Sequence, residues 1–137
     1  MKPSVLSVAA LALVFAGVAC ATNRTYYLAA VEVDWDYAPS GIDQWHNVPL
    51  EESDDAAVFC TRDDTHIGRV YRKAIFRGYT DETFSQQIET PAWMGFLGPV
   101  IRAEVGDEVH VVFKNLASRP YSIHPHGVHY TKEHEGA

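Results

Sequence analysis

The chain is poor in basic residues, in cysteine and in any pattern typical of a long helix. Its 137 residues include 11 Lys and Arg against 18 Asp and Glu, which gives a formal net charge of −7. A nucleic-acid-binding surface needs a basic patch, so this balance argues against nucleic acid as a partner. The two cysteines, Cys20 and Cys60, do not make a disulfide framework. Apolar residues, at 47%, are plentiful enough for the core of one domain.

The N-terminus has the pattern of a secretory signal peptide. Lys2 supplies a positive charge, and residues 5–18 form an apolar run that is short for a membrane span. Ala19-Cys20-Ala21 is a small-x-small cleavage site, which predicts a signal peptide over residues 1–21 and one domain over residues 22–137. We expect a secreted, extracellular protein, or one on the extracellular face of the plasma membrane if an anchor follows this sequence.

Two residues of the mature chain bear on this location. Asn23 begins an N-glycosylation sequon, Asn23-Arg24-Thr25, and is a predicted glycosylation site. Cys60 is left without a partner once Cys20 is removed, so it is expected to be buried, reactive or paired outside this chain.

Short apolar runs separated by Gly and Pro turns predict an all-β domain. In residues 25–37, Val31, Val33 and Trp35 alternate with acidic residues, as in a half-buried strand. Further strands are expected over residues 70–77, 100–105 and 109–114, with a short one at 57–60 inside the acidic, loop-like stretch 42–65. Strands at intervals of about ten residues, without an amphipathic helix, indicate a β-sandwich or barrel.

The segment His124-Pro125-His126-Gly127 is the strongest candidate for a functional site. In extended backbone alternate side chains share a face, which places the two Cβ atoms about 6–7 Å apart. That spacing suits two imidazoles that reach neighbouring metal ions. Pro125 donates no hydrogen bond, so the pair is expected at a strand end or sheet edge, and Gly127 frees the backbone after it. From the pair alone, ordinary surface histidines remain the alternative.

Segments along the mature chain resemble the N-terminal cupredoxin domain of the multicopper ferroxidases typified by ceruloplasmin and hephaestin. They include Trp93-Met94-Gly95 and His124-Pro125-His126-Gly127, and only residues 42–65 match poorly. The matching segments are residues 26–28, 33–37, 67–73, 79–84, 91–101, 103–107, 114–121, 124–127 and 132–137. The resemblance implies a cupredoxin-like Greek-key β-sandwich or barrel.

The resemblance also implies a copper site. By position, His124 is expected to bind the type 2 copper and His126 one type 3 copper of a trinuclear cluster, which reduces O2 to water with electrons from Fe2+. Imidazole suits copper in both oxidation states, and an acceptor is expected at each remaining ring nitrogen. The family also binds structural cations, and Gly68, Tyr71 and Lys132 match positions for a Ca2+ or Na+ ion.

The expected ligand set is incomplete in this sequence. In the family, the other cluster ligands lie in a later strand and in the last domain, and Cys60 lacks the histidines of a blue-copper site. We therefore expect a sandwich truncated before its last strands, inactive alone, whose partners are later cupredoxin domains of the same polypeptide. Surface or structural roles are expected for the remaining histidines, namely His46, His66, His110, His129 and His134.

Two alternatives remain open at this point. One is a non-catalytic cupredoxin A-type domain, similar to those of coagulation factors V and VIII, that acts as an interaction module. The other is a truncated, secreted copper-binding protein without turnover. The pair His124 and His126 favours the oxidase, because the coagulation-factor pattern lacks paired histidines.

Overall fold

The computed structural model describes residues 21–136, and most of their regular structure is strand. The elements in order are β1 (Asn23–Asp36), β2 (Ile42–Asp43), β3 (Val48–Pro49), α1 (Ala57–Cys60), β4 (Val70–Tyr79) and β5 (Glu108–Asn115). Short 3-10 turns cover Leu50–Glu52, Ala92–Met94 and Lys132–His134. The all-β prediction is confirmed, whereas the predicted signal peptide lies outside the described residues apart from its last position. No helix among residues 21–136 has the length and apolar character of a membrane span.

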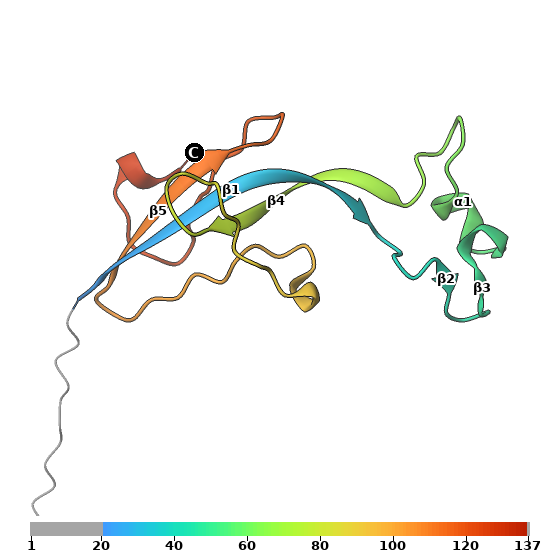
Figure 1. The fold of residues 1–137 in the computed structure, drawn as a ribbon, viewed down its shortest axis with the longest axis horizontal. Helices are drawn as coiled ribbons and strands as arrows, with labels where there is room; N and C mark the ends of the chain where they lie inside the picture. Colours follow the sequence, from blue (N-terminus) through green and yellow to red (C-terminus); the bar gives the residue numbers. More distant parts are fainter. Residues whose placement is uncertain (1–20, 137) are drawn as a thin grey trace, which may run out of the picture.

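β1 is the central strand of a three-stranded sheet with the order β4-β1-β5 (Figure 1). β4 runs antiparallel to β1 and pairs Tyr79 with Tyr27. β5 runs parallel to β1 on the other side and pairs Phe113 with Leu28. A parallel pair needs a long crossover, and residues 37–107, which include β4, connect β1 to β5. After β4 the chain reaches β5 through the irregular residues 80–107, which contain one 3-10 turn.

The core of the described region is small and lies along the middle of the sheet. Leu28, Ala29 and Ala30 of β1 are buried, together with Ile75 and Tyr79 of β4. β5 is covered much less: Val109, Val111 and Val112 keep 40%, 38% and 41% of their surface exposed. The outer strand therefore carries apolar surface that residues 21–136 leave open.

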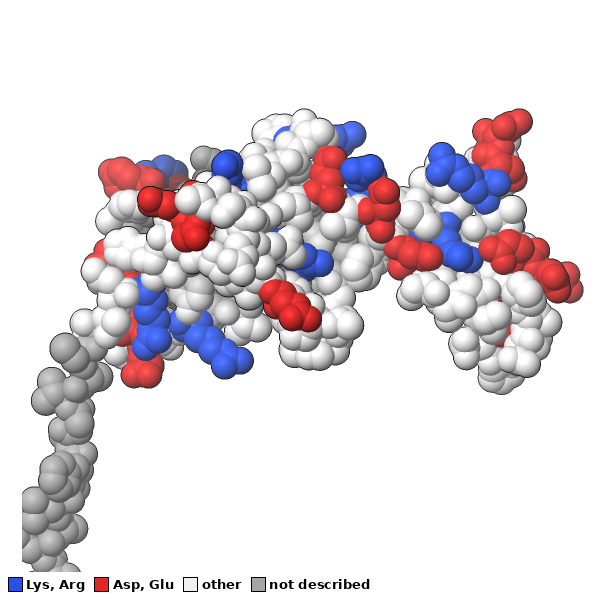
Figure 2. Space-filling model, in the orientation of Figure 1, with Lys and Arg blue, Asp and Glu red and all other residues white. Residues whose placement is uncertain are grey.

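Residues 42–65 form a separate small lobe at the far end of the curved β1–β4 ribbon (Figure 1). Asp43 organises it, because its carboxylate accepts hydrogen bonds from Ser53 Oγ (2.7 Å) and from the backbone N–H of Trp45 (2.9 Å). The bonds from Ser53 and His46 hold the pKa of Asp43 well below its usual range. Figure 2 shows Asp and Glu side chains on the outer rim of this lobe.

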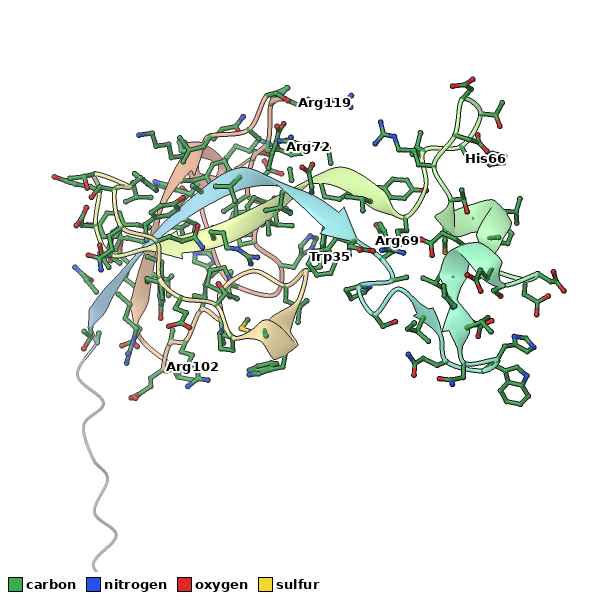
Figure 3. All side chains as sticks on the ribbon, turned by 45° about the vertical axis from the view of Figure 1, so that its right-hand side comes forward. Trp35, His66, Arg69, Arg72, Arg102 and Arg119 are labelled. Atoms are coloured by element: carbon green, nitrogen blue, oxygen red, sulfur yellow. The ribbon has the colours of Figure 1, made fainter. Side chains whose placement is uncertain are left out.

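Arg69 connects the lobe to the sheet. Its Nε donates to Asp36 Oδ2 at the end of β1 (3.2 Å), and its Nη1 donates to Glu51 Oε1 in the lobe (3.1 Å). Figure 3 shows Arg69 between these two parts, on the segment that leads into β4. One planar guanidinium thus binds carboxylates from both parts at once.

The strand predictions for residues 57–60 and 100–105 are wrong. Residues 57–60 form α1, in which the backbone N–H groups of Cys60 and Thr61 donate to Ala56 and Ala57 (3.0 and 2.9 Å). An apolar run of four residues fits a helical turn as well as a strand, and no neighbouring strand pairs with this one.

Residues 100–105 do not form the predicted strand either, although the chain there is apolar and β-branched. The hydroxyl of Tyr26 accepts a hydrogen bond from the N–H of Arg102 (3.0 Å) and donates to the carbonyl of the same residue (2.5 Å). A side chain of β1 therefore satisfies the backbone groups that a sheet partner would otherwise bind.

Asp107 joins the start of β1 to the turn before β5. Its carboxylate accepts hydrogen bonds from the backbone of Thr22 (3.0 Å) and Glu104 (2.8 Å) and from Arg24 Nε, and its side chain is only 4% exposed. Two hydrogen bonds hold the pKa of Asp107 below its ordinary value. The bond from the Glu104 N–H has the larger effect, and the bond from Arg24 has the next largest.

We expect Asp107→Asn to destabilise the sheet at neutral pH and to reduce its acid sensitivity. The pKa of Asp107 in the folded state is below the unfolded value of about 3.9. The carboxylate therefore stabilises the folded sheet fully at pH values above the unfolded pKa, and this stabilisation is lost as pH falls through the folded pKa. Urea unfolding of both chains at decreasing pH measures the difference. Asp64→Asn, at an exposed lobe position, is the control. If the difference in unfolding free energy between wild type and Asp107→Asn stays constant in acid, the prediction is contradicted.

Candidate metal centre

The histidine pair lies in the irregular loop that follows β5. The ring centroids of His124 and His126 are 4.8 Å apart and the ring planes are nearly perpendicular, at 87°. Both side chains are exposed. The expectation that the pair lies in a strand end is wrong, because residues 121–126 form no ladder. Gly127 does adopt a left-handed conformation, with φ +73°, in which a glycine is favoured.

The ring of His124 is fixed by two neighbours. Its Nδ1 lies 2.6 Å from the carbonyl oxygen of Glu135, and its ring meets the ring of Tyr130 edge-on at 5.7 Å. Because a carbonyl oxygen only accepts, the Nδ1 of His124 carries the proton, and in the neutral ring Nε2 keeps a free lone pair. Ligating histidines commonly have such an acceptor on the second ring nitrogen, and the structure places one at His124.

The ring of His126 is less constrained. Within residues 21–136 it contacts the ring of His124 and forms no side-chain hydrogen bond. Both of its nitrogens are therefore open to a ligand in this part of the chain. The acceptor expected on the ring of His126 is not among the described residues.

The donors present fit part of a copper site. Neutral imidazole is a good ligand for copper, and His124 is held in the tautomer that leaves Nε2 for a metal. Across residues 21–136 there is no group of three or more His, Cys, Asp or Glu side chains that could hold a metal ion. A complete copper coordination shell therefore needs donors from outside the described residues.

Most of the other histidines bind neighbouring carboxylates. His46 lies 2.8 Å from Asp43, His66 lies 3.0 Å from Asp63, and His110 lies 3.1 Å from Glu108. In the last turn of the chain, His134 Nδ1 lies 2.9 Å from the hydroxyl of Thr131. These contacts support the surface and structural roles expected from the sequence.

The residues expected at a structural cation are split between two places. Gly68 and Tyr71 lie together at the start of β4, beside the lobe. Lys132 lies in the 3-10 turn drawn in red at the opposite end of the sheet (Figure 1). Its Nζ forms an ion pair with Glu135. The structure therefore brings two of the three residues together.

The remaining predicted positions are accessible. Asn23 is the first residue of β1 and is exposed, so its amide is open to solvent. Cys60 ends α1 and is half-buried, and within residues 21–136 it forms no disulfide.

The sequence did not reveal the contribution of Glu135 and Gly136 to the site. Glu135 acts through its main-chain carbonyl, which every residue type has, so its identity carries no signal. Gly136 adopts φ +74°, and the tolerance of glycine for this conformation is the only hint in the sequence.

Comparison with known proteins confirms the resemblance. Residues 81–137 match the family model described as multicopper oxidase. The chain is 49% identical over 120 residues to human ceruloplasmin, 46% over 115 residues to human hephaestin and 47% over 121 residues to human ferroxidase HEPHL1. These matches cover 87%, 84% and 88% of this chain, and the chain spans about a tenth of the length of each relative (11%, 10% and 10%). The chain is a ceruloplasmin/hephaestin-like cupredoxin domain of the multicopper oxidase type.

Proposed function

We propose that this domain supplies two copper ligands, His124 and His126, to a longer multicopper ferroxidase. The observation that carries the proposal is the contact of two exposed imidazoles, 4.8 Å apart, one of which has its Nδ1 proton committed to a carbonyl. Three relatives that are 46–49% identical support it, since one of them is named as a ferroxidase and the other two are hephaestin and ceruloplasmin.

In this proposal the two histidines bind different ions of one cluster. His124 binds the type 2 copper through Nε2, and His126 binds one type 3 copper. A bound copper cluster would pass four electrons, one from each of four Fe2+ ions, to one O2, which would take up four protons and become two waters. The described residues contribute ring donors, and the carbonyl of Glu135 holds one ring in the ligating tautomer.

Later cupredoxin domains of the same polypeptide are the proposed source of the missing ligands. β5 is an edge strand of the described sheet, and its valines are about 40% exposed. An unpaired edge with apolar side chains needs cover in a stable protein. We therefore propose that further strands and domains pack here, and that the chain alone has no ferroxidase activity.

The other proposed features concern export and stability. We propose residues 1–21 as a signal peptide, residues 22–137 as the cupredoxin domain, secretion or display at the extracellular face of the membrane, and a glycan on Asn23. A structural Ca2+ or Na+ at Gly68 and Tyr71 needs its remaining donors from groups other than Lys132, because Lys132 lies at the opposite end of the sheet.

Copper titration of the full chain tests the histidine assignment. We expect weak binding of Cu2+, because two imidazoles leave the coordination shell unfilled. His124→Ala/His126→Ala should lower the affinity at least about 10-fold, as changes at metal sites typically do. His110→Ala/His129→Ala is the matched control and should bind as the wild type does.

Two outcomes would contradict the proposal. Copper binding that survives His124→Ala/His126→Ala removes these residues from the site. Catalytic oxidation of Fe2+ by the isolated chain shows that the missing ligands are not needed. Electron paramagnetic resonance of the Cu2+-loaded chain reports whether nitrogen donors are bound.

A further inference from the structure

The last turn of the described chain, residues 131–136, closes on the backbone that carries His124. The carbonyl of Glu135 accepts the Nδ1 proton of His124 at 2.6 Å. The next residue, Gly136, approaches the main chain of Ile123: a Cβ at this position would overlap the Ile123 carbonyl oxygen and lie 2.9 Å from its carbon. The 131–136 turn thus contacts both the ring of His124 and the peptide group just before it.

Gly136 is required at this position for two reasons. Its φ of +74° lies in the left-handed region, which other residues adopt at a cost. The space that a side chain would need is filled by the backbone of Ile123, which cannot rotate away as a flexible side chain would. Any larger residue therefore displaces either the 131–136 turn or the segment that carries His124.

The 131–136 turn also has hydrogen bonds and an ion pair of its own. The N–H of His134 donates to the carbonyl of Thr131 (3.0 Å), and the hydroxyl of Thr131 lies 2.9 Å from the ring of His134. Lys132 forms an ion pair with the side chain of Glu135. The Glu135 carbonyl is therefore already in place before any ligand reaches the His124 ring.

A neutral imidazole carries its proton on either nitrogen, and the hydrogen bond at one nitrogen decides which of them is left for a metal. The Glu135 carbonyl cannot donate, so it selects the Nδ1–H form of His124. The edge-on contact with the ring of Tyr130 restricts the same imidazole from a second side. Ring tautomer and ring orientation are set together.

We propose that the 131–136 turn is the positioning element of His124, with the Glu135 carbonyl selecting the Nδ1–H tautomer and Gly136 allowing the close approach. An effect of the turn on copper binding rests on the proposed function of His124 as a ligand. The hydrogen bond between His124 and Glu135 is present in the metal-free chain. The turn acts through the ring of His124 and contributes no ligand of its own.

NMR of the metal-free full chain with 15N- and 13C-labelled histidine tests the proposal, because the ring shifts distinguish the two tautomers. The wild type should show His124 in the Nδ1–H form. Gly136→Ala should lose that form. Gly106→Ala is the matched control, since Gly106 also has a positive φ, +99°, lies just before β5 and outside the segment of the histidine pair, and an added Cβ meets no atom within 4 Å. Glu135→Gln removes the ion pair with Lys132 and keeps the carbonyl, so it should keep the Nδ1–H form.

A chain that ends at His134 covers the case in which Gly136→Ala fails to fold. It removes the acceptor carbonyl without adding a clash, and it should lose the Nδ1–H signal of His124 while the sheet persists in circular dichroism. If either variant folds and still shows the Nδ1–H form, the proposal is overturned. An Nε2–H form of His124 in the wild type overturns it as well.

Copper affinity gives a second, separable readout. Gly136→Ala should bind Cu2+ about 10–100-fold more weakly than the wild type, as is typical when an outer hydrogen-bond partner of a ligand is lost. Gly106→Ala should keep His124 in its wild-type tautomer and should not show this loss. If Gly136→Ala changes the tautomer while copper affinity is unaltered, the positioning of the ring stands and the assignment of His124 as a ligand fails.

Discussion

Truncation of Ile75 to alanine is expected to cost about 2–5 kcal/mol of unfolding free energy, as buried Ile-to-Ala changes do. Ile75 lies on β4 opposite Val31 of β1 and is 4% exposed. It is one of few large apolar side chains buried within residues 21–136. Domains are stable by only about 5–15 kcal/mol, so this change removes a large part of the stability.

Urea unfolding followed by circular dichroism measures the Ile75→Ala effect. Ile67→Ala is a matched control, because Ile67 loses the same atoms but is 61% exposed. The midpoint should fall strongly for Ile75→Ala and barely for Ile67→Ala. Equal shifts in the two variants would show that the β1–β4 core does not stabilise the sheet as the structure indicates.

Replacement of Gly68 by alanine is expected to destabilise the junction between the lobe of residues 42–65 and β4. Gly68 has φ +74°, and an added Cβ would lie 3.1 Å from Arg62 Cβ and 3.2 Å from the Cys60 carbonyl oxygen. A left-handed conformation costs a non-glycine residue about 1–3 kcal/mol. The crowding against Cys60 and Arg62 adds to that cost.

Gly106→Ala is a control for the cost of a positive φ without crowding. Gly106 also has a positive φ, +99°, but an added Cβ there meets no atom within 4 Å. Hydrogen exchange should therefore report faster opening of residues 57–70 in Gly68→Ala, and a smaller change around residue 106 in Gly106→Ala, where only backbone strain is added. Identical exchange in wild type and Gly68→Ala would mean that the turn at Gly68 is more open than described.

The three long strands follow from local pattern, and the elements that differ depend on distant contacts. Alternation in residues 25–37 predicts β1, and the apolar runs near Ile75 and Val111 predict its two neighbours. The pattern of residues 100–105 is equally apolar, but Tyr26 binds the backbone of Arg102 there. No local signal shows that a tyrosine far away in the sequence takes the place of a strand.

In the candidate site, too, the sequence reveals one part and leaves another part hidden. The spacing of His124 and His126 reveals the pair, because imidazole side chains have a chemistry that the sequence displays. The hydrogen bond from His124 to Glu135 uses a main-chain acceptor, which no residue type marks. Tyr130 is an aromatic residue whose contact with the His124 ring depends on the fold of the loop.

We expect His124 and His126 to bind copper in the protein to which this domain belongs. Anomalous diffraction at the copper edge, on crystals of the copper-loaded longer protein, tests it most directly. We expect copper peaks at bonding distance from Nε2 of His124 and from a ring nitrogen of His126, on two different ions. Copper bound in this protein with neither ring as a ligand would contradict it.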